Sequence, residues 1–201
     1  MQDRQSLKAR KSAETRARLI ATARVLFGAA GYAATGTEEI VAGAAVTRGA
    51  LYFHFADKSA LFAAVLDEVA REIAAAIADA AEGEADPIAA LCRGAAAYVD
   101  ACCDPTRRRI YLADGPSVLG AAQWHAAENR YSRPLLRAGV ATALARPGAV
   151  ACDAEALTAL LSGAMTEAAI WLADAVDPAA ARRRALAALD VMLARLFAAP
   201  A

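Results

Sequence analysis

Apolar residues recur every three or four positions along most of the chain, and this spacing predicts amphipathic α-helices. The first helix is predicted over residues 12–31, where Gly31 supplies a C-terminal stop. A second, longer helix is predicted from Asp57 to about Ala81. Its apolar stripe consists of Leu61, Phe62, Val65, Leu66, Val69 and Ile73. Because the chain is rich in alanine and holds only 12 glycines and 7 prolines, we expect an all-α fold.

Two shorter helices fit between these long ones, within residues 37–58. Thr37 is suited to begin the first, because its hydroxyl can accept from N–H groups of the first turn, and Thr47 is suited to cap the second. Leu51 and Phe55 lie four residues apart and are predicted to face the core. Two short helices joined by a tight turn predict a helix-turn-helix, whose second helix enters the major groove of DNA.

The remaining residues of the second short helix carry the chemistry that DNA recognition needs. The Arg48 guanidinium can reach a guanine edge, and Tyr52 and His54 can donate to phosphate. Asp57 is predicted to cap the long helix, which places Lys58 in its first turn beside the phosphate backbone. Each residue taken singly fits a cap, a core position or a solvated surface equally well, but their joint spacing favours DNA binding.

The segment from Ala23 to Leu61 resembles TetR-family transcriptional regulators. The matching residues between these two are Phe27, Gly31, Tyr32, Thr35, Thr37, Ile40, Ala44, Val46, Thr47, Gly49, Leu51, Tyr52, His54, Phe55 and Lys58. The resemblance implies DNA contacts by Thr37, Thr47, Arg48, Gly49, Tyr52, His54 and Lys58, with Thr37, Tyr52, His54 and Lys58 at phosphates. The sequence departs from the family at Ala45, where a turn glycine is usual, so this turn must avoid or tolerate a left-handed backbone angle. The family's base preference is therefore not transferable.

Beyond residue 81 the pattern predicts a body of further helices. Their predicted starts are Asp86-Pro87, Asp104-Pro105, Asp153 and Asp177-Pro178. Predicted interruptions lie at Gly115-Pro116, near Pro134 and at Pro147-Gly148. Together with the resemblance, this order predicts two domains. Residues 1–56 would form a DNA-binding helix-turn-helix head with a flexible, basic N-terminal arm over residues 1–11, and residues 57–201 a helical effector-binding and dimerisation domain.

The last two predicted helices carry apolar stripes with abundant alanine beside them. The resemblance implies a homodimer through these helices, and a two-fold dimer would read a palindromic operator in double-stranded DNA. The predicted interface residues are Leu157, Leu161, Ala164, Ala168, Leu186, Leu189 and Leu193. The alternative is that both stripes belong to the core of the protomer itself.

Bulky and polar residues among the alanines of the body suggest a small-molecule pocket. The candidates are Tyr98, Tyr111, Trp124, His125, Met165, Glu167 and Trp171. An apolar cavity with a few polar groups is the usual form of a ligand site, so we expect a hydrophobic or aromatic effector. For each residue taken alone, core packing or surface exposure is the better interpretation.

The net charge of the chain is zero, but its distribution is uneven. Residues 1–58 hold nine Lys and Arg against five Asp and Glu, which gives +4, and the remainder carries −4. A basic head on an acidic body suits a protein that touches DNA with one end. The chain shows neither a membrane-length apolar run free of charge nor a signal-peptide core, so we expect no membrane partner and a cytoplasmic location.

Chemistry other than binding has little support in the sequence. Cys92, Cys102, Cys103 and Cys152 lack the C-x-x-C spacing of a zinc or redox site, and no nucleophile motif or phosphate-binding glycine loop is present. We therefore predict no catalytic residue, no metal and no cofactor. The sequence predicts a ligand-responsive repressor; an activator, or a thiol redox sensor that uses Cys102 and Cys103, is the alternative, and an enzyme with a helical substrate-binding body is a weaker one.

Overall fold

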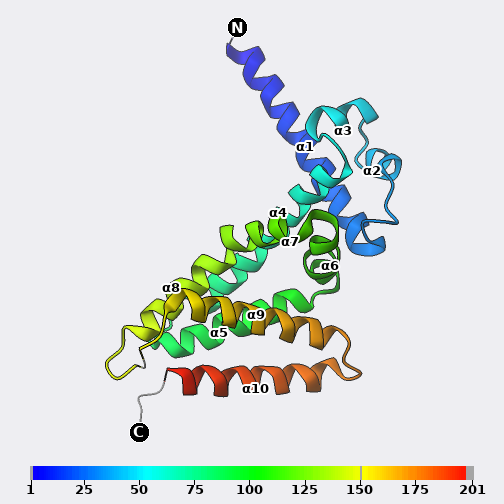
Figure 1. Ribbon diagram of the computed structural model, residues 1–201. Coiled ribbons are helices and arrows are strands. Elements are labelled where there is room, and N and C mark those ends of the chain that lie inside the picture. The colour runs from blue at the N-terminus through cyan, green and yellow to red at the C-terminus, as the bar shows by residue number, and fades with distance from the viewer. Residues whose placement is uncertain (1, 150, 198–201) are drawn as a thin grey trace. The chain divides into compact units, whose positions relative to one another are not determined.

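The computed structural model describes residues 2–149 and 151–197, and every regular element in these ranges is a helix, which confirms the all-α prediction (Figure 1). The elements are α1 Gln2–Ala30, α2 Thr37–Gly43, α3 Arg48–His54, α4 Lys58–Ala81, α5 Pro87–Cys103, α6 Pro105–Arg108, the π-helix η1 Arg109–Asp114, α7 Gly115–Arg130, α8 Ser132–Leu144, α9 Ala154–Ala173 and α10 Pro178–Leu196.

The described chain forms two compact units. The first, here the head unit, comprises residues up to 69 and residues 105–124; the second, here the body unit, comprises residues 70–104 and those from 125 onward. The head unit thus holds α6, η1 and the start of α7, which lie far beyond residue 56 in the sequence. Sequence periodicity cannot reveal this, because it reports the helices and not their tertiary partners. The predicted functional division at residue 57 stays a prediction.

The core of the head unit is built where α1, α4 and the turn after α1 meet. Gly31 ends α1 with a φ of 86°, as predicted. The rings of Phe27, Tyr32 and Phe62 then pack edge to face, with centroids 5.2 Å apart for Tyr32 and Phe62 and 5.3 Å apart for Phe27 and Phe62. Leu51 and Phe55 are also buried, which confirms that α3 packs its predicted face inward.

The N-terminal segment differs from its prediction. Residues predicted to form a flexible arm lie in α1, which begins at Gln2. An ion pair between Arg10 and Glu14 (3.5 Å) and a hydrogen bond from Thr15 Oγ1 to the carbonyl of Lys11 (2.9 Å) line its surface. Once residues 19–30 are anchored in the core, extending the helix needs no new nucleus, so a polar segment can remain helical without an apolar stripe.

The body unit consists mainly of α5, α8, α9 and α10, which pack against one another (Figure 1). Three predicted caps are confirmed: Asp86, Asp153 and Asp177 accept from the N–H groups of residues 89, 156 and 180. By length and composition, α9 is the one helix in the described ranges that could cross a membrane, but it holds Glu155 and Glu167 and is therefore not a run free of charge. Its packing against three neighbouring helices accounts for that apolar composition.

The chain does not break at Gly115-Pro116 as predicted. Gly115 is helical, with φ −50° and ψ −61°, and η1 leads directly into α7. A side chain at Gly115 would place its Cβ 2.8 Å from Leu66 Cδ1 and 2.9 Å from Trp124 Cδ1, so close packing accounts for this glycine. The kink lies instead at Gly120, where φ is 78° and ψ is 157°. The interruption predicted near Pro134 occurs at Tyr131, between α7 and α8.

The apolar stripes of α9 and α10 face mainly into the body unit. Leu157, Leu161, Leu189 and Leu193 are all buried within the protomer, which favours the alternative that these stripes belong to its own core, and their part in a dimer interface stays a prediction. Ala164, Ala168 and Leu186 are half-buried. The exposed face carries other apolar residues, including Leu160 and Val191, whose exposed fractions are 71% and 63%. Periodicity locates an apolar stripe on a helix but does not say which neighbour covers it.

Candidate nucleic-acid interface and effector cavity

The two short helices in the head unit meet at a tight turn that Ala45 enables. The N–H of Ala45 donates to the carbonyl of Ala42 (3.1 Å) and that of Val46 to Val41 (3.1 Å), which closes α2. Ala45 has a φ of 51°, so the turn tolerates the left-handed angle rather than avoiding it. Thr47 accepts from the N–H of Ala50 (3.2 Å) and caps α3 as predicted. Thr37 is the first residue of α2 and Gly36 is the N-cap, without a side-chain bond, so the capping prediction for Thr37 is wrong.

The face of α3 opposite Leu51 and Phe55 is open to solvent. Arg48, Gly49 and Tyr52 are exposed, and His54 is half-buried. The Arg48 guanidinium lies 2.8 Å from Glu38 Oε1 on α2 and 5.6 Å from the ring centroid of Tyr52. This ion pair lies at the surface, where such pairs contribute less than about 1 kcal/mol, so Arg48 can leave Glu38 for a base edge.

Phe53, which the sequence analysis did not single out, is 78% exposed on the same helix. An aromatic side chain this open to water on a helix of a packed unit is a feature of a contact surface. Its neighbours Tyr52 and His54 were recognised because hydroxyl and imidazole groups suggest phosphate contacts, whereas a phenylalanine resembles a core residue in sequence.

Lys58 is the first residue of α4, in the first turn as predicted, but its side chain is occupied within the head unit. Its ammonium donates to the carbonyls of Tyr32 (2.9 Å) and Thr35 (3.0 Å) and lies 4.1 Å from the Tyr32 ring centroid. Lys58 therefore closes the turn between α1 and α2. A phosphate contact by Lys58 stays a prediction, and it would have to be made in addition to these bonds.

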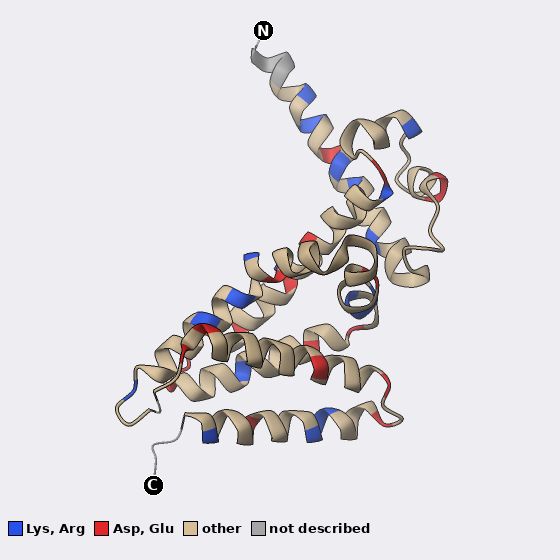
Figure 2. Ribbon diagram, viewed as in Figure 1, with Lys and Arg blue, Asp and Glu red and all other residues tan. Residues whose placement is uncertain are grey.

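Basic residues recur along α1 in the head unit (Figure 2). The exposed ones are Lys8, Arg10, Lys11, Arg16 and Arg18. The Arg16 guanidinium lies 5.2 Å from the ring centroid of Phe55, the residue that ends α3. This contact places at least part of the basic row next to the helix-turn-helix, where a phosphate backbone would pass.

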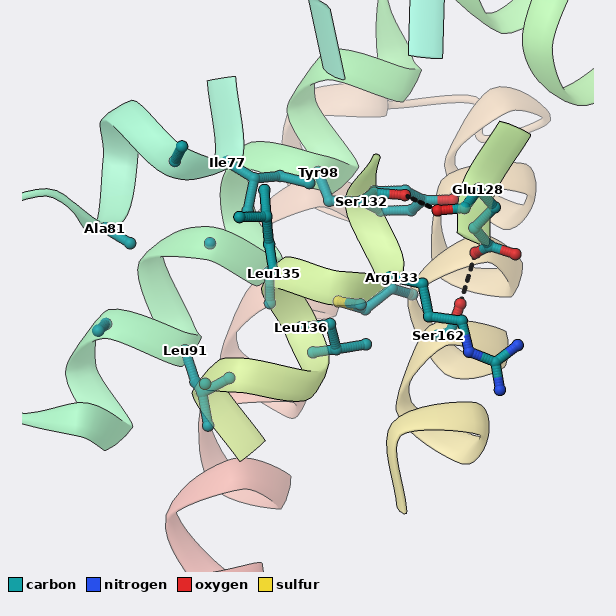
Figure 3. Close-up of a pocket in the computed structure, with 16 residues that line it drawn as sticks. Ile77, Ala81, Leu91, Tyr98, Glu128, Ser132, Arg133, Leu135, Leu136 and Ser162 are labelled. Carbon is teal, nitrogen blue, oxygen red and sulfur yellow. Dashed lines mark hydrogen bonds between the residues drawn. The ribbon is translucent and has the colours of Figure 1, made fainter. Parts of the chain in front are cut away.

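The body unit contains a cavity of about 230 Å³ between α4, α5, α8 and α9 (Figure 3). Its walls are apolar and include Ile77, Leu91, Leu135, Leu136 and Met165. Its polar end is formed by Glu128 of α7, which is only 4% exposed. Ser162 Oγ donates to Glu128 Oε1 (2.5 Å), and Oε2 of the same carboxyl lies 3.3 Å from His125 Nδ1. An apolar cavity with one buried carboxyl has the usual form of a ligand site.

Two of the seven predicted pocket residues, Tyr98 and Met165, line this cavity, and the other five do not. Tyr111 and Trp124 pack together in the head unit, where the indole N–H donates to the carbonyl of Tyr111 (2.7 Å). His125, Glu167 and Trp171 are exposed. Glu128 and Ser162 were missed because a glutamate and a serine in a helix resemble surface residues, and only tertiary packing buries them.

The four cysteines are free thiols. Burial, followed by a hydrogen bond and the negative charge of Asp190, raises the pKa of Cys92 to about 11, so its reactive thiolate is scarce at neutral pH. Cys102 is fully buried, Cys103 is half-buried and Cys152 is exposed. Thiol chemistry at Cys92 is therefore disfavoured, and the redox alternative, which concerns Cys102 and Cys103, stays a prediction.

Two family models match the chain. One, described as the tetracyclin repressor-like C-terminal domain, matches residues 88–196, and one, described as bacterial regulatory proteins of the tetR family, matches residues 19–65. The HTH-type transcriptional regulator AcrR of Shigella flexneri is 46% identical over 52 residues, which are 26% of this chain and 24% of that protein. The matched segment thus spans about a quarter of this curated relative.

Solved structures are similar over nearly the whole chain. A TetR-family transcriptional regulator from Pectobacterium atrosepticum is 34% identical, covers 95% of this chain and 98% of its own, and has a TM-score of 0.78. RolR in complex with resorcinol is 22% identical, with coverages of 96% and 97% and a TM-score of 0.72. At that identity the likeness to RolR concerns the fold alone.

Proposed function

This chain belongs to the TetR family of bacterial transcriptional regulators, and from that premise we propose that it is a repressor which leaves a palindromic operator when a small effector binds its body unit. The observation that carries the proposal is the solvent-exposed face of α3, which presents Arg48, Gly49 and Tyr52 while Leu51 and Phe55 anchor the helix. This is the layout of a recognition helix that reads base edges in the major groove.

The cavity of the body unit is the proposed effector site. Its size and apolar walls favour a small hydrophobic or aromatic molecule, and the presence of resorcinol in RolR, a protein of the same fold, supports this class. An effector releases DNA only if it binds one conformation of the protein more tightly than the DNA-bound one. The proposed release therefore requires that effector binding in this cavity lowers the affinity of the head unit for DNA.

Dimerisation is proposed to use the exposed face of α9 and α10 rather than the buried leucines. This face carries Leu160, Trp171 and Val191, together with the half-buried Ala164 and Ala168. A two-fold dimer presents two copies of α3, which is why the operator should be a palindrome with half-sites a whole number of DNA turns apart. The protein is proposed to act in the cytoplasm, where its DNA is.

A gel-shift assay tests the function directly. The full chain is mixed with DNA upstream of its own coding region, in moderate salt with excess random competitor, and a discrete shifted band is expected. The same probe then serves to screen small aromatic molecules for release. A shift that the random competitor removes at equal concentration would contradict sequence-specific binding. Release by peroxide and restoration by thiol, instead of release by a small molecule, would favour the redox alternative.

A further inference from the structure

The polar end of the cavity in the body unit restricts the chemistry of its ligand, an argument that rests on the effector role proposed above. Among the sixteen lining residues drawn in Figure 3, Glu128 and Arg133 are the charged ones. The Arg133 guanidinium contacts Asn129 Oδ1 (3.3 Å) and Glu155 Oε1 (3.4 Å), both on exposed residues, and it points away from Leu91 and Leu135. The carboxyl of Glu128 is therefore the charged group at the cavity.

We infer that the ligand has an apolar body and a hydrogen-bond-donating head group, a hydroxyl or a protonated amine, which binds Glu128. An ionised carboxyl only accepts hydrogen bonds, and its two oxygens offer about four lone-pair positions. Ser162 Oγ occupies one of these on Oε1, and the imidazole of His125 approaches Oε2 from outside the cavity, so accepting capacity remains for a ligand.

The same geometry rejects anionic ligands. A carboxylate or phosphate head would lie beside the buried Glu128 carboxyl, and two like charges at such a distance repel strongly where water is scarce. The hydroxyl of Tyr98 cannot easily relieve this, because it shares a hydrogen bond with Thr166 Oγ1 (2.9 Å). Fatty acids and benzoates are thus the wrong class for this cavity.

The walls set the size of the ligand body. An apolar cavity of about 150 Å³ is large enough to bind benzene. The present cavity, at about 230 Å³, has room for a single ring with a short substituent. Ile77 and Leu136, both labelled in Figure 3, would contact that ring, and Glu128 its head group.

Four matched probes test the inference by calorimetric titration of the full chain without DNA. They are 4-ethylphenol, 4-ethylbenzylamine, 4-ethylanisole and 4-ethylbenzoate, which share one body and differ in the head group. We expect the phenol, the amine or both to bind at least about tenfold more tightly than the anisole and the benzoate, as a hydrogen bond to a charged group predicts. Tighter binding of the phenol would identify the head group as a neutral donor. Tighter binding of the amine would identify it as a cation.

Equal affinities for all four probes, tighter binding of the benzoate, or no binding of either donor at millimolar concentration would overturn the inference. In the Glu128→Gln variant, the advantage of whichever donor binds more tightly to the unmodified chain should fall at least about tenfold, while the anisole binds as before. Loss of anisole affinity as well would indicate a merely structural role. Glu167→Gln, on an exposed glutamate of α9, is the matched control and should change nothing.

Operator binding is measured separately by gel shift, so the two proposals fail independently. If the chain shifts operator DNA but binds donor probes no more tightly than the others, the proposed regulator is supported and the inferred ligand class is contradicted. If the chain binds donor probes more tightly but shifts no DNA, the inferred ligand class is supported and the proposed regulator is contradicted. If Glu128→Gln does not fold, the four probes with the unmodified chain still decide the question.

Discussion

At the scale of single residues, Ala45 holds the most unfavourable backbone angle among the described non-glycine residues. Alanine in the left-handed region costs about 1–2 kcal/mol because its Cβ approaches the following carbonyl, whereas glycine has no such contact. Ala45→Gly should therefore raise the free energy of unfolding by about 1 kcal/mol, as measured by urea denaturation. Ala42→Gly, in the regular part of α2, should lower it by about 0.5–1 kcal/mol. Destabilisation by both would show that the turn is not strained.

Arg48 is the residue on which base recognition is proposed to depend. Arg48→Ala should reduce the difference in binding free energy between operator and random DNA by about 1–3 kcal/mol, because a bidentate contact to guanine is lost. Competition gel shifts against random DNA measure this difference. Arg183→Ala, on the exposed face of α10, serves as the control. Equal losses on operator and random DNA would refute a base-reading role for Arg48.

Lys58 joins a structural role to a predicted DNA contact. Lys58→Met removes the donor for the carbonyls of Tyr32 and Thr35, so the free energy of unfolding should fall by about 1–3 kcal/mol. Lys11→Met, at an exposed position of α1, should leave it unchanged. If Lys58 also contacts phosphate, the salt dependence of DNA binding should flatten by about one unit. An unchanged salt slope would leave Lys58 with the structural role alone.

At the scale of elements, several helix caps can be predicted from the local sequence, whereas the partners against which the helices pack cannot. The caps at Asp86, Asp153 and Asp177 depend on residues three positions apart, so the sequence contains all the information that they need. The position of Glu128 depends on α7 and α9 meeting, which no local pattern encodes. The same limit holds for Leu157 and the other apolar residues of its stripe, because their spacing is identical whether the stripe faces the protomer's own core or a second chain.

The direct continuation of η1 into α7 depends on Gly115, where a glycine leaves room for the neighbouring side chains. Gly115→Ala would place a Cβ 3.2 Å from the carbonyl oxygen of Ile110 and closer still to two side chains, so the free energy of unfolding should fall by about 1–3 kcal/mol. Gly163→Ala in α9 meets nothing within 4 Å and should raise it by about 0.5–1 kcal/mol. Thermal unfolding of both variants measures the difference, and a neutral Gly115→Ala would show that η1 can shift to make room.

At the scale of the whole molecule, the proposed function requires that two chains associate. The exposed apolar side chains of α9 and α10 are the proposed contact, so Leu160→Asp with Val191→Asp should shift the chain from dimer to monomer in sedimentation experiments. Operator affinity should fall with it, because one recognition helix remains. Val176→Asp, fully exposed between α9 and α10, is the control. A double variant that stays dimeric would place the interface on another surface.

The pair formed by Arg48 and Glu38 has a consequence for how such a protein finds its site. On random DNA, phosphates hold the protein through charge alone, and a base edge that offers Arg48 nothing leaves it on Glu38. Only a base that competes with the carboxylate draws the side chain away. If Arg48 reads a base as proposed, Glu38 competes with that base for the guanidinium. We therefore expect Glu38→Ala to lengthen the time that the protein spends on non-operator sequences and so to slow its search for the operator.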